Sequence, residues 1–276
     1  MGVTEATIDT IDVCALNGQP LVIAPGNMAG ATGPISLAGN VSQANAEFLG
    51  INVYAQMVRP GTPVVYGFAS TVSDMKNMQA SNASPGFVKE AKYGALMAKK
   101  YGLACRSGGG MSDASGLTAQ AGVESAMSMF ESFSEGANLM MHACGSLHSF
   151  NTVSFEKFLL DIETFTRMKY YFSDLPCDED ALAFDAIKEA IEDEGGVYIT
   201  LDHTYERCRI DPWYHQVSVH TNTKGDPNQA LYDSIHKRMD ALLNSYECPA
   251  LASEKRAALD DIMRGLGMKD SDIAKV

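Results

Sequence analysis

Short apolar runs alternate with longer amphipathic stretches over the first 170 residues of the chain. The four runs with the length of a buried strand are 21–25, 64–68, 103–106 and 139–143. The four stretches with helical spacing that follow them are 40–58, 86–101, 117–134 and 154–172. Four strand–helix units in a row predict a parallel sheet with helices outside it, because each parallel crossover needs a covering helix.

The remaining third of the chain is predicted to be mostly helical. A helix over 178–194 begins with acidic residues and stops at two glycines, and 197–201 (VYITL) is a candidate fifth strand. Two further helices are expected over 228–246 and 253–266, with Ser253 as the cap of the second. A closed barrel needs about eight such units and about 250 residues. Because only five strands are predicted, we expect that the sheet closes in a different way or that the chain is part of a longer protein.

Composition limits the classes of partner. The chain carries 21 basic and 34 acidic residues, a net charge of −13, which disfavours nucleic acid and suits either a cationic substrate or plain solubility. Six scattered cysteines, without a CxxC pair, are typical of a reducing compartment. Neither a signal peptide nor an apolar run long enough for a bilayer is evident, so we expect a soluble cytoplasmic protein without membrane contact.

Candidate chemistry lies in the loops after the strands, where parallel α/β folds place their ligands. Tyr66 and Phe150 are either core aromatics or part of a cage for a quaternary ammonium. His142 and His148 are either structural or substrate contacts, because their spacing fits a zinc site poorly.

Other polar groups near these loops have simpler interpretations. Gln120 and Glu124, at i and i+4 of a helix, form either a solvated or capping pair or a catalytic one. The glycines of 107–110 favour turns, since the spacing of a phosphate-binding loop is absent. No Gly-x-Ser-x-Gly elbow indicates serine chemistry.

Several blocks resemble one known family. Residues 29–39 read AGATGPISLAG and 60–67 read PGTPVVYG. The segment 105–110 reads CRSGGG and is followed by Asp113 and by QAGVE at 120–124. The series continues with the strand that contains His142, with SFE at 154–156, and with HT at 203–204 together with Trp213. Together these blocks are similar to those of the trimethylamine methyltransferase family, from about residue 24 to residue 213.

The resemblance implies a (β/α)8 TIM-type barrel whose mouth receives a corrinoid protein. Members of the family are much longer, so the chain is expected to be the C-terminal part: a partial barrel over 1–220 that lacks its N-terminal strands, and a helical extension over 221–276 packed on it. The expected partners are a corrinoid protein and a small quaternary or tertiary amine, and a homo-oligomer is compatible with the sequence.

The resemblance also implies the chemistry. The Co(I) of the partner's corrinoid attacks an N-methyl group, and no cofactor binds this chain directly. Members that use trimethylamine carry pyrrolysine, whereas the present sequence has only standard residues, which favours a quaternary amine similar to glycine betaine. Catalytic residues are not assigned; the substrate-binding candidates are Tyr66, His142, His148, Phe150, Gln120 and Glu124.

Two alternatives stay open from the sequence. A truncated barrel that binds an amine or a protein without catalysis would explain the missing strands. A barrel lyase or aldolase would need a Schiff-base lysine at a strand end, whereas Lys89, Lys92, Lys99 and Lys100 all fall in the helix before the third strand.

Overall fold

The computed structural model of the chain describes residues 2–192, 195–220 and 222–274. The chain divides into two compact units, residues 1–239 and residues 240–276, and each is described by itself. The predicted boundary at residue 220 and the packing of 221–276 on the barrel stay predictions. None of the described helices is both long and apolar enough to cross a membrane.

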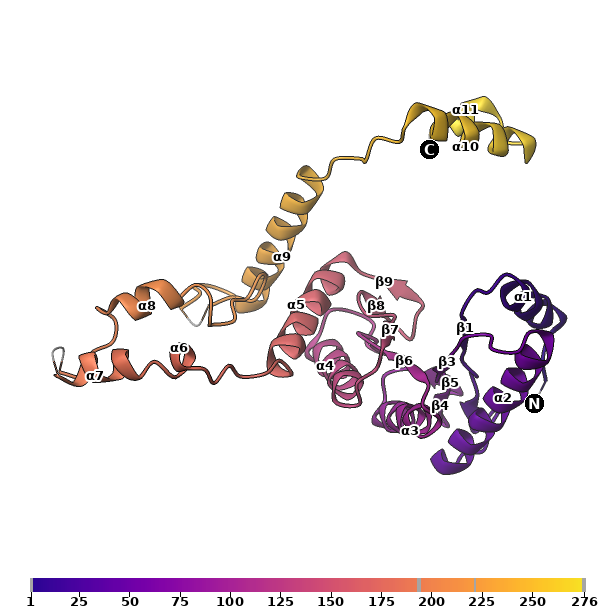
Figure 1. Ribbon diagram of the computed structural model, residues 1–276, viewed down its shortest axis with the longest axis horizontal. Helices are drawn as coiled ribbons and strands as arrows, with labels where there is room; N and C mark the ends of the chain where they lie inside the picture. The colour runs from indigo at the N-terminus through magenta and orange to yellow at the C-terminus, as the bar shows by residue number, and fades with distance from the viewer. Residues whose placement is uncertain (1, 193–194, 221, 275–276) are drawn as a thin grey trace. The chain divides into compact units, whose positions relative to one another are not determined.

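The first unit is built on a four-stranded parallel sheet (Figure 1). Its strands, in spatial order, are β1 (Leu21–Ile23), β3 (Val64–Gly67), β6 (Ala104–Gly108) and β7 (Leu139–Met141). The helices that follow these strands are α2 (Leu37–Val58), α3 (Pro85–Tyr101), α4 (Ala119–Ser134) and α5 (Phe155–Tyr171). The four predicted strand–helix units are therefore confirmed, and an unpredicted helix, α1 (Glu5–Leu16), precedes them.

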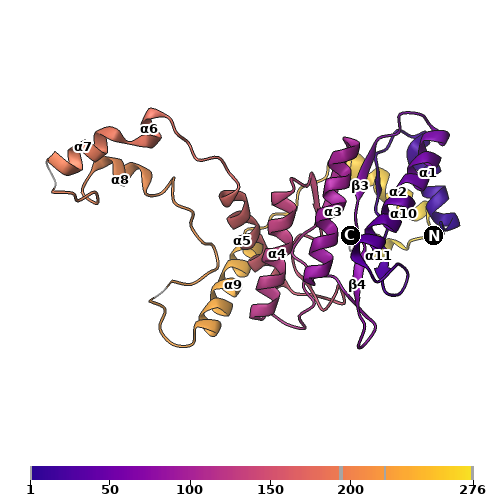
Figure 2. The ribbon, with the colours of Figure 1, turned by 90° about the horizontal axis from the view of Figure 1, so that it is seen from below.

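Local sequence fixes where these helices begin and end. Ser84, Thr118 and Ser154 are the N-caps of α3, α4 and α5, and each side chain accepts a hydrogen bond from a backbone N–H of the first turn. At the C-terminal end of α3, Gly102 takes a left-handed conformation that favours glycine. Figure 2 shows α3 and α4 side by side, with α5 next to α4, as their contacts confirm.

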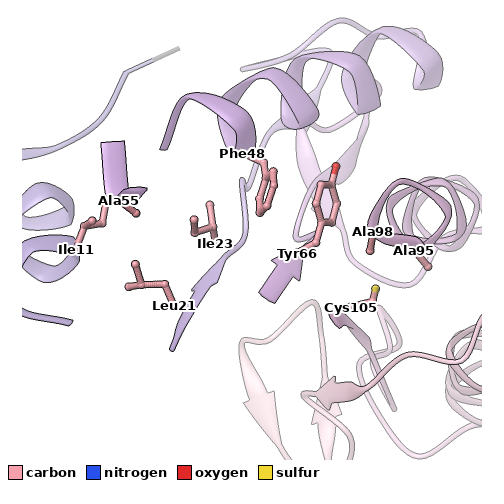
Figure 3. Close-up of a cluster of buried hydrophobic side chains, with 9 residues drawn as sticks. All are labelled: Ile11, Leu21, Ile23, Phe48, Ala55, Tyr66, Ala95, Ala98 and Cys105. Atoms are coloured by element: carbon pink, nitrogen blue, oxygen red, sulfur yellow. The ribbon is translucent and has the colours of Figure 1, made fainter. Parts of the chain in front are cut away.

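The largest core cluster lies between the sheet and the helices (Figure 3). Ile23, Tyr66 and Cys105 stand in register on three adjacent strands and pack with Phe48 of α2 and Ala95 of α3. Because side chains alternate along a strand, the neighbouring positions face the other side of the sheet.

That other face of the sheet is partly open. Val22 of β1 is 42% exposed, and Leu139 and Met141 of β7 are 41% and 38% exposed. The two edge strands, β1 and β7, pair with no further strand of the described chain in this sheet. The structure thus shows an α/β fold with a parallel sheet covered by helices on one face.

Small additional strands follow the carboxyl ends of the main ones. The three-stranded sheet consists of β2 (Met28–Ala29), β4 (Thr71–Asp74) and β5 (Gln79–Ser81), and the hairpin after β7 consists of β8 (Ser146–Leu147) and β9 (Thr152–Val153). The sequence pattern did not predict these strands, because they are short and mix polar with apolar residues. They add structure to the loops at the carboxyl ends of the main sheet.

The rest of the first unit contains short helices joined by irregular segments: α6 (Glu179–Leu182), α7 (Phe184–Glu192), α8 (Asp202–Arg207) and the start of α9 (Pro227–Asn244). The single helix predicted over 178–194 is split at Ala183, which is left-handed (φ 51°), and its last two residues lie outside the described part. The predicted strand over 197–201 is wrong. None of its residues is in a strand, residues 199–200 lie in a turn, and the side chain of Leu201 packs against Ala186 and Ala190 instead of entering a sheet.

The second unit contains α10 (Ser253–Gly265) and α11 (Asp270–Ile273). The predicted cap of α10 is wrong by one residue: Ala252 is the N-cap, Ser253 is the first helical residue, and no side chain caps this helix end. Arg256 joins the two helices, because its Nη2 donates to the Ile273 carbonyl at 3.1 Å.

Candidate functional site

The loops that leave the four main strands are hydrogen-bonded to their neighbours. The Thr71 N–H, after β3, donates to the Asn27 carbonyl, after β1, at 2.8 Å. The His148 N–H, after β7, donates to the Ala114 carbonyl, after β6, at 2.9 Å. These loops therefore gather at one end of the sheet, as expected for parallel strands.

The carboxylate of Asp113 joins two hairpins at this end of the sheet. It accepts hydrogen bonds from Ser81 Oγ at 2.5 Å and the Asn82 N–H at 2.9 Å, at the end of the β4–β5 hairpin. It also accepts from Ser149 Oγ at 2.6 Å, at the tip of the β8–β9 hairpin. Asp113 is thus a structural bridge between segments far apart in the sequence.

Gln120 and Glu124 hold the loop that presents Asp113. Glu124 Oε2 accepts from Ser112 Oγ at 2.7 Å and from the Asp113 N–H at 2.9 Å, and Gln120 Nε2 donates to Glu124 Oε1 at 2.8 Å. Because both carboxylate oxygens have partners within the protein, this geometry fits the capping interpretation of the pair.

His142 and Phe150 are brought together. Their ring centroids are 4.7 Å apart at an interplanar angle of 56°, and Phe150 is 44% exposed. His142 follows β7 directly, with a left-handed backbone (φ 52°). Burial, and then the nearby charge of Arg106, lower the pKa of His142, so its ring is neutral at pH 7. A neutral ring beside an exposed phenyl ring can face a cation without repelling it.

His148 lies elsewhere on the same rim. It lines a cavity of about 400 Å³ together with Asp74, Ser84, Asp113 and Ser149. His148, Ser149 and Phe150 have φ angles of 50°, 51° and 72°, so three successive non-glycine residues are left-handed. Such conformations cost about 1–3 kcal/mol each and tend to occur at functional sites.

Tyr66 is in the core. Its side chain is 1% exposed and packs against Phe48, with ring centroids 4.3 Å apart. Its hydroxyl donates to Asn45 Oδ1 at 3.1 Å, so both ends of the side chain have partners on the helix-facing side of the sheet. The sequence allowed Tyr66 to be either a core aromatic or part of a cation cage, and the structure places its side chain in the core.

A buried ion pair that the sequence pattern did not predict lies behind the loops. Lys157 and Asp161, one turn apart on α5, are 1% and 3% exposed, and Lys157 Nζ lies 2.5 Å from Asp161 Oδ2. The ammonium also donates to the Gly110 carbonyl at 2.7 Å and Ser125 Oγ at 2.8 Å, while Asp161 accepts from the Gly145 N–H at 2.8 Å. The pair therefore fixes the loops after β6 and β7.

Gly109 and Gly110 allow close packing between these loops. A Cβ added to Gly109 would lie 2.5 Å from Ala143 Cα, and one added to Gly110 would lie 2.4 Å from the Ala143 carbonyl oxygen. Only glycine allows this approach of the two backbones. Among the described residues, no group of three or more His, Cys, Asp and Glu side chains is arranged to hold a metal ion.

Comparison with known proteins gives relatives over nearly the whole chain. Glycine betaine methyltransferase of Desulfitobacterium hafniense (strain Y51) is 37% identical over 266 residues, 92% of this chain and 53% of that protein. Two proteins of Eubacterium limosum also match: the L-carnitine:corrinoid methyltransferase, 36% identical over 88% of this chain and 50% of its own length, and the proline betaine:corrinoid methyltransferase, 28% identical over 94% and 54%.

The chain thus spans about half the length of the curated relatives that it matches. The family whose model matches is described as trimethylamine methyltransferase (MTTB), and the match covers residues 1–265. The match is longer at both ends than the segment from about residue 24 to residue 213 that shows the resemblance in the sequence. The chain therefore belongs to the trimethylamine methyltransferase family.

Proposed function

We propose that this chain is part of a corrinoid-dependent methyltransferase that takes a methyl group from a quaternary amine similar to glycine betaine. Three relatives support the proposal, since they are named for glycine betaine, L-carnitine and proline betaine, and two of the names include the corrinoid. The proposal includes the partial (β/α) barrel, with the four parallel strands as its sheet, and a cytoplasmic location, which six free cysteines favour.

The proposed reaction does not require a general acid or a general base. The Co(I) of the partner's corrinoid supplies the electron pair for the new bond to carbon, and the breaking C–N bond leaves its pair on nitrogen. A quaternary ammonium thereby becomes a neutral tertiary amine without any proton transfer. The protein's task is to hold the substrate in line and to limit the access of water.

The paired rings of His142 and Phe150 carry the proposal on the structural side. They lie at the carboxyl end of β7, where the sheet ends and its loops gather. Aromatic faces attract an alkylated ammonium by about 0.5–2 kcal/mol for each good contact. The low pKa of His142 supports this role, because a protonated imidazole would repel the substrate's cation.

The test is methyl transfer by the chain with reduced corrinoid protein and glycine betaine, followed as dimethylglycine by NMR. We expect product, and we expect Phe150→Ala to lower the rate about tenfold through the lost ring contact. The matched control is Phe184→Ala on α7, a phenylalanine that is 67% exposed and far along the chain from the site. Equal rates for both variants would contradict the placement of the substrate.

A second candidate function is binding without catalysis, which the half-length match to the relatives favours. Calorimetry that shows betaine binding, combined with no dimethylglycine in the transfer assay, would support it. Product formation by the chain would exclude it.

A further inference from the structure

The orientation of the His142 ring depends on the backbone that carries it. Its side chain forms no hydrogen bond within the described part of the chain, and its ring contact is with Phe150. Its backbone is left-handed, with φ 52°, a conformation that a residue other than glycine keeps only where the surrounding structure holds it. The ring therefore stays beside Phe150 only if the segment that follows His142 is fixed.

The segment after this histidine is held by three hydrogen bonds of its backbone. The Ala143 carbonyl accepts from the Gly110 N–H at 2.8 Å. The Gly145 N–H donates to Asp161 Oδ2 at 2.8 Å, and the Gly145 carbonyl accepts from the Ser154 N–H at 3.0 Å. Two of the three partners belong to the N-terminal part of α5 or its cap, so this helix is the main support of the segment.

Lys157 connects the remaining partner to the same helix. Its ammonium donates to the Gly110 carbonyl at 2.7 Å and to Ser125 Oγ at 2.8 Å, and it lies 2.5 Å from Asp161 Oδ2. An ammonium has three donors, and here each has an acceptor, so its position is well determined. Because Lys157 and Asp161 are one turn apart, they lie on the same face of α5. One helix face thus sets the spacing between the loops after β6 and β7.

Stability alone does not account for the burial of this pair. Moving two charges out of water costs about as much free energy as their attraction returns, and apolar residues of similar volume often replace such a pair without loss. Apolar residues, however, offer neither a donor for the Gly110 carbonyl nor an acceptor for the Gly145 N–H. The pair therefore differs from an apolar replacement chiefly in the geometry that it imposes on the two loops.

We propose that Lys157 and Asp161 are positioning residues, which hold the His142 ring against Phe150 through the loops after β6 and β7. The proposal rests on the proposed function, in which these two rings face the alkylated ammonium, and it adds the residues that keep the rings in place. Lys157 and Asp161 act through the loops, since both are closed to solvent. In a reaction that depends on the placement of a methyl group, a displacement of about 1 Å lowers the rate by about 100-fold.

Two double variants separate the geometry from the charges. Lys157→Met/Asp161→Leu and Lys157→Met/Asp161→Asn both remove the buried charges. Only the asparagine keeps an oxygen that can accept from the Gly145 N–H. Lys169→Met, at an exposed lysine of the same helix, is the matched control.

The readout is the imidazole C–H signal of His142 in NMR spectra recorded without substrate. His142→Gln identifies the signal, and Phe150→Ala gives its position without the neighbouring ring. We expect the signal of the leucine double variant to move to that position, and the asparagine double variant to stay closer to the wild type. The control should match the wild type. The rate of methyl transfer from glycine betaine should fall about 10- to 100-fold in the leucine double variant and less in the asparagine one.

The outcomes separate this proposal from the proposed function. A leucine double variant that is folded by circular dichroism but keeps the wild-type His142 signal overturns the positioning role. A displaced signal with an unchanged rate overturns its part in the reaction. Because the signal is recorded without substrate, a wild type that transfers no methyl group overturns the proposed function, while the signal still decides whether the pair positions the ring.

A measurement on the wild type decides if the leucine double variant does not fold. Hydrogen exchange followed by NMR compares the Gly145 amide with that of exposed Gly225. We expect the Gly145 amide to exchange much more slowly, because its N–H donates to a carboxylate that is closed to solvent. Equal exchange rates would overturn the proposal.

Discussion

Lys157 Nζ lies 2.5 Å from Asp161 Oδ2 in a space that is closed to solvent. Each member of the pair reaches one loop of the candidate site, Lys157 through the Gly110 carbonyl and Asp161 through the Gly145 N–H. Burial raises the pKa of Asp161, although the charge of Lys157 opposes this. The negative charge of Asp161 therefore depends on the positive charge of Lys157.

Removal of one partner should cost more than removal of both. Lys157→Met leaves a buried carboxylate uncompensated, and we expect it to lower the free energy of unfolding by about 3–5 kcal/mol. The double variant Lys157→Met/Asp161→Leu should recover a large part of that loss, because no charge is left buried. Urea unfolding followed by circular dichroism measures both; a double variant as unstable as the single one would contradict this account.

Alanine at Gly110 should disturb the same two loops. Its Cβ would lie 2.4 Å from the Ala143 carbonyl oxygen and 2.7 Å from Asp161 Oδ2, so the backbones must move apart. We expect Gly110→Ala to destabilise the fold by about 1–3 kcal/mol. Gly116→Ala is the control, because its Cβ would meet nothing within 4 Å. Thermal melts compare the two, and equal melting temperatures would show that the approach is not required.

Glu163 should make stability depend on pH in acid. Burial alone would raise its pKa, but hydrogen bonds from Ser218 Oγ, the Val217 N–H and Arg167 outweigh burial and lower the pKa to about 2. The stabilisation is present above the ordinary pKa of about 4.5 and is lost as the pH falls from there to about 2. We expect Glu163→Gln to abolish this pH dependence and to lower the free energy of unfolding by about 3 kcal/mol at neutral pH.

The single tryptophan offers a local measurement of that effect. Trp213 lies near the segment that Glu163 binds, and its ring is 4.3 Å from Arg167 Cζ. Its fluorescence should change between pH 4.5 and 2 in the wild type, and already at pH 7 in Glu163→Gln. An unchanged spectrum in the variant would mean that the carboxylate does not hold this segment.

Glu131 should have the opposite effect from Glu163, because it should make the protein less stable as the pH rises. Burial raises its pKa to about 7, although Ser107 donates to it. Between its ordinary pKa of about 4.5 and pH 7 the unfolded chain loses the proton while the folded chain keeps it, so stability falls as the pH rises. At pH 8 we expect Glu131→Gln to raise the free energy of unfolding by up to about 3 kcal/mol. Exposed Glu189→Gln is the control, and urea midpoints at pH 5 and pH 8 distinguish the two.

The sequence predicted the regular part of the fold, because each main strand is a short apolar run followed by an amphipathic helix. It could not predict the strands β2, β4 and β5, which depend on pairing between loops rather than on apolar alternation. The same limit explains the error at 197–201: a β-branched run becomes a strand only beside another strand, and here Leu201 packs on α7.

The contacts among the candidate residues could be predicted only in part, for a similar reason. The loops after the strands could be located, and His142 and Phe150 do meet. Tyr66 was placed at a strand exit, but strand alternation turns it toward Phe48. Lys157 and Asp161 have the spacing of an ordinary surface pair on a helix, and burial, which gives them their role, follows only from tertiary packing.

Asp113 has a consequence for how the rim of the molecule moves. One carboxylate holds Ser81 and Ser149, which belong to hairpins 68 residues apart in the chain (149 − 81). The two hairpin ends therefore share one side-chain contact, the carboxylate of Asp113, while the His148 N–H also binds the Ala114 carbonyl. A change that displaces this carboxylate removes the Ser81 and Ser149 contacts together, so the side-chain hydrogen bonds of the two hairpins are lost in one event.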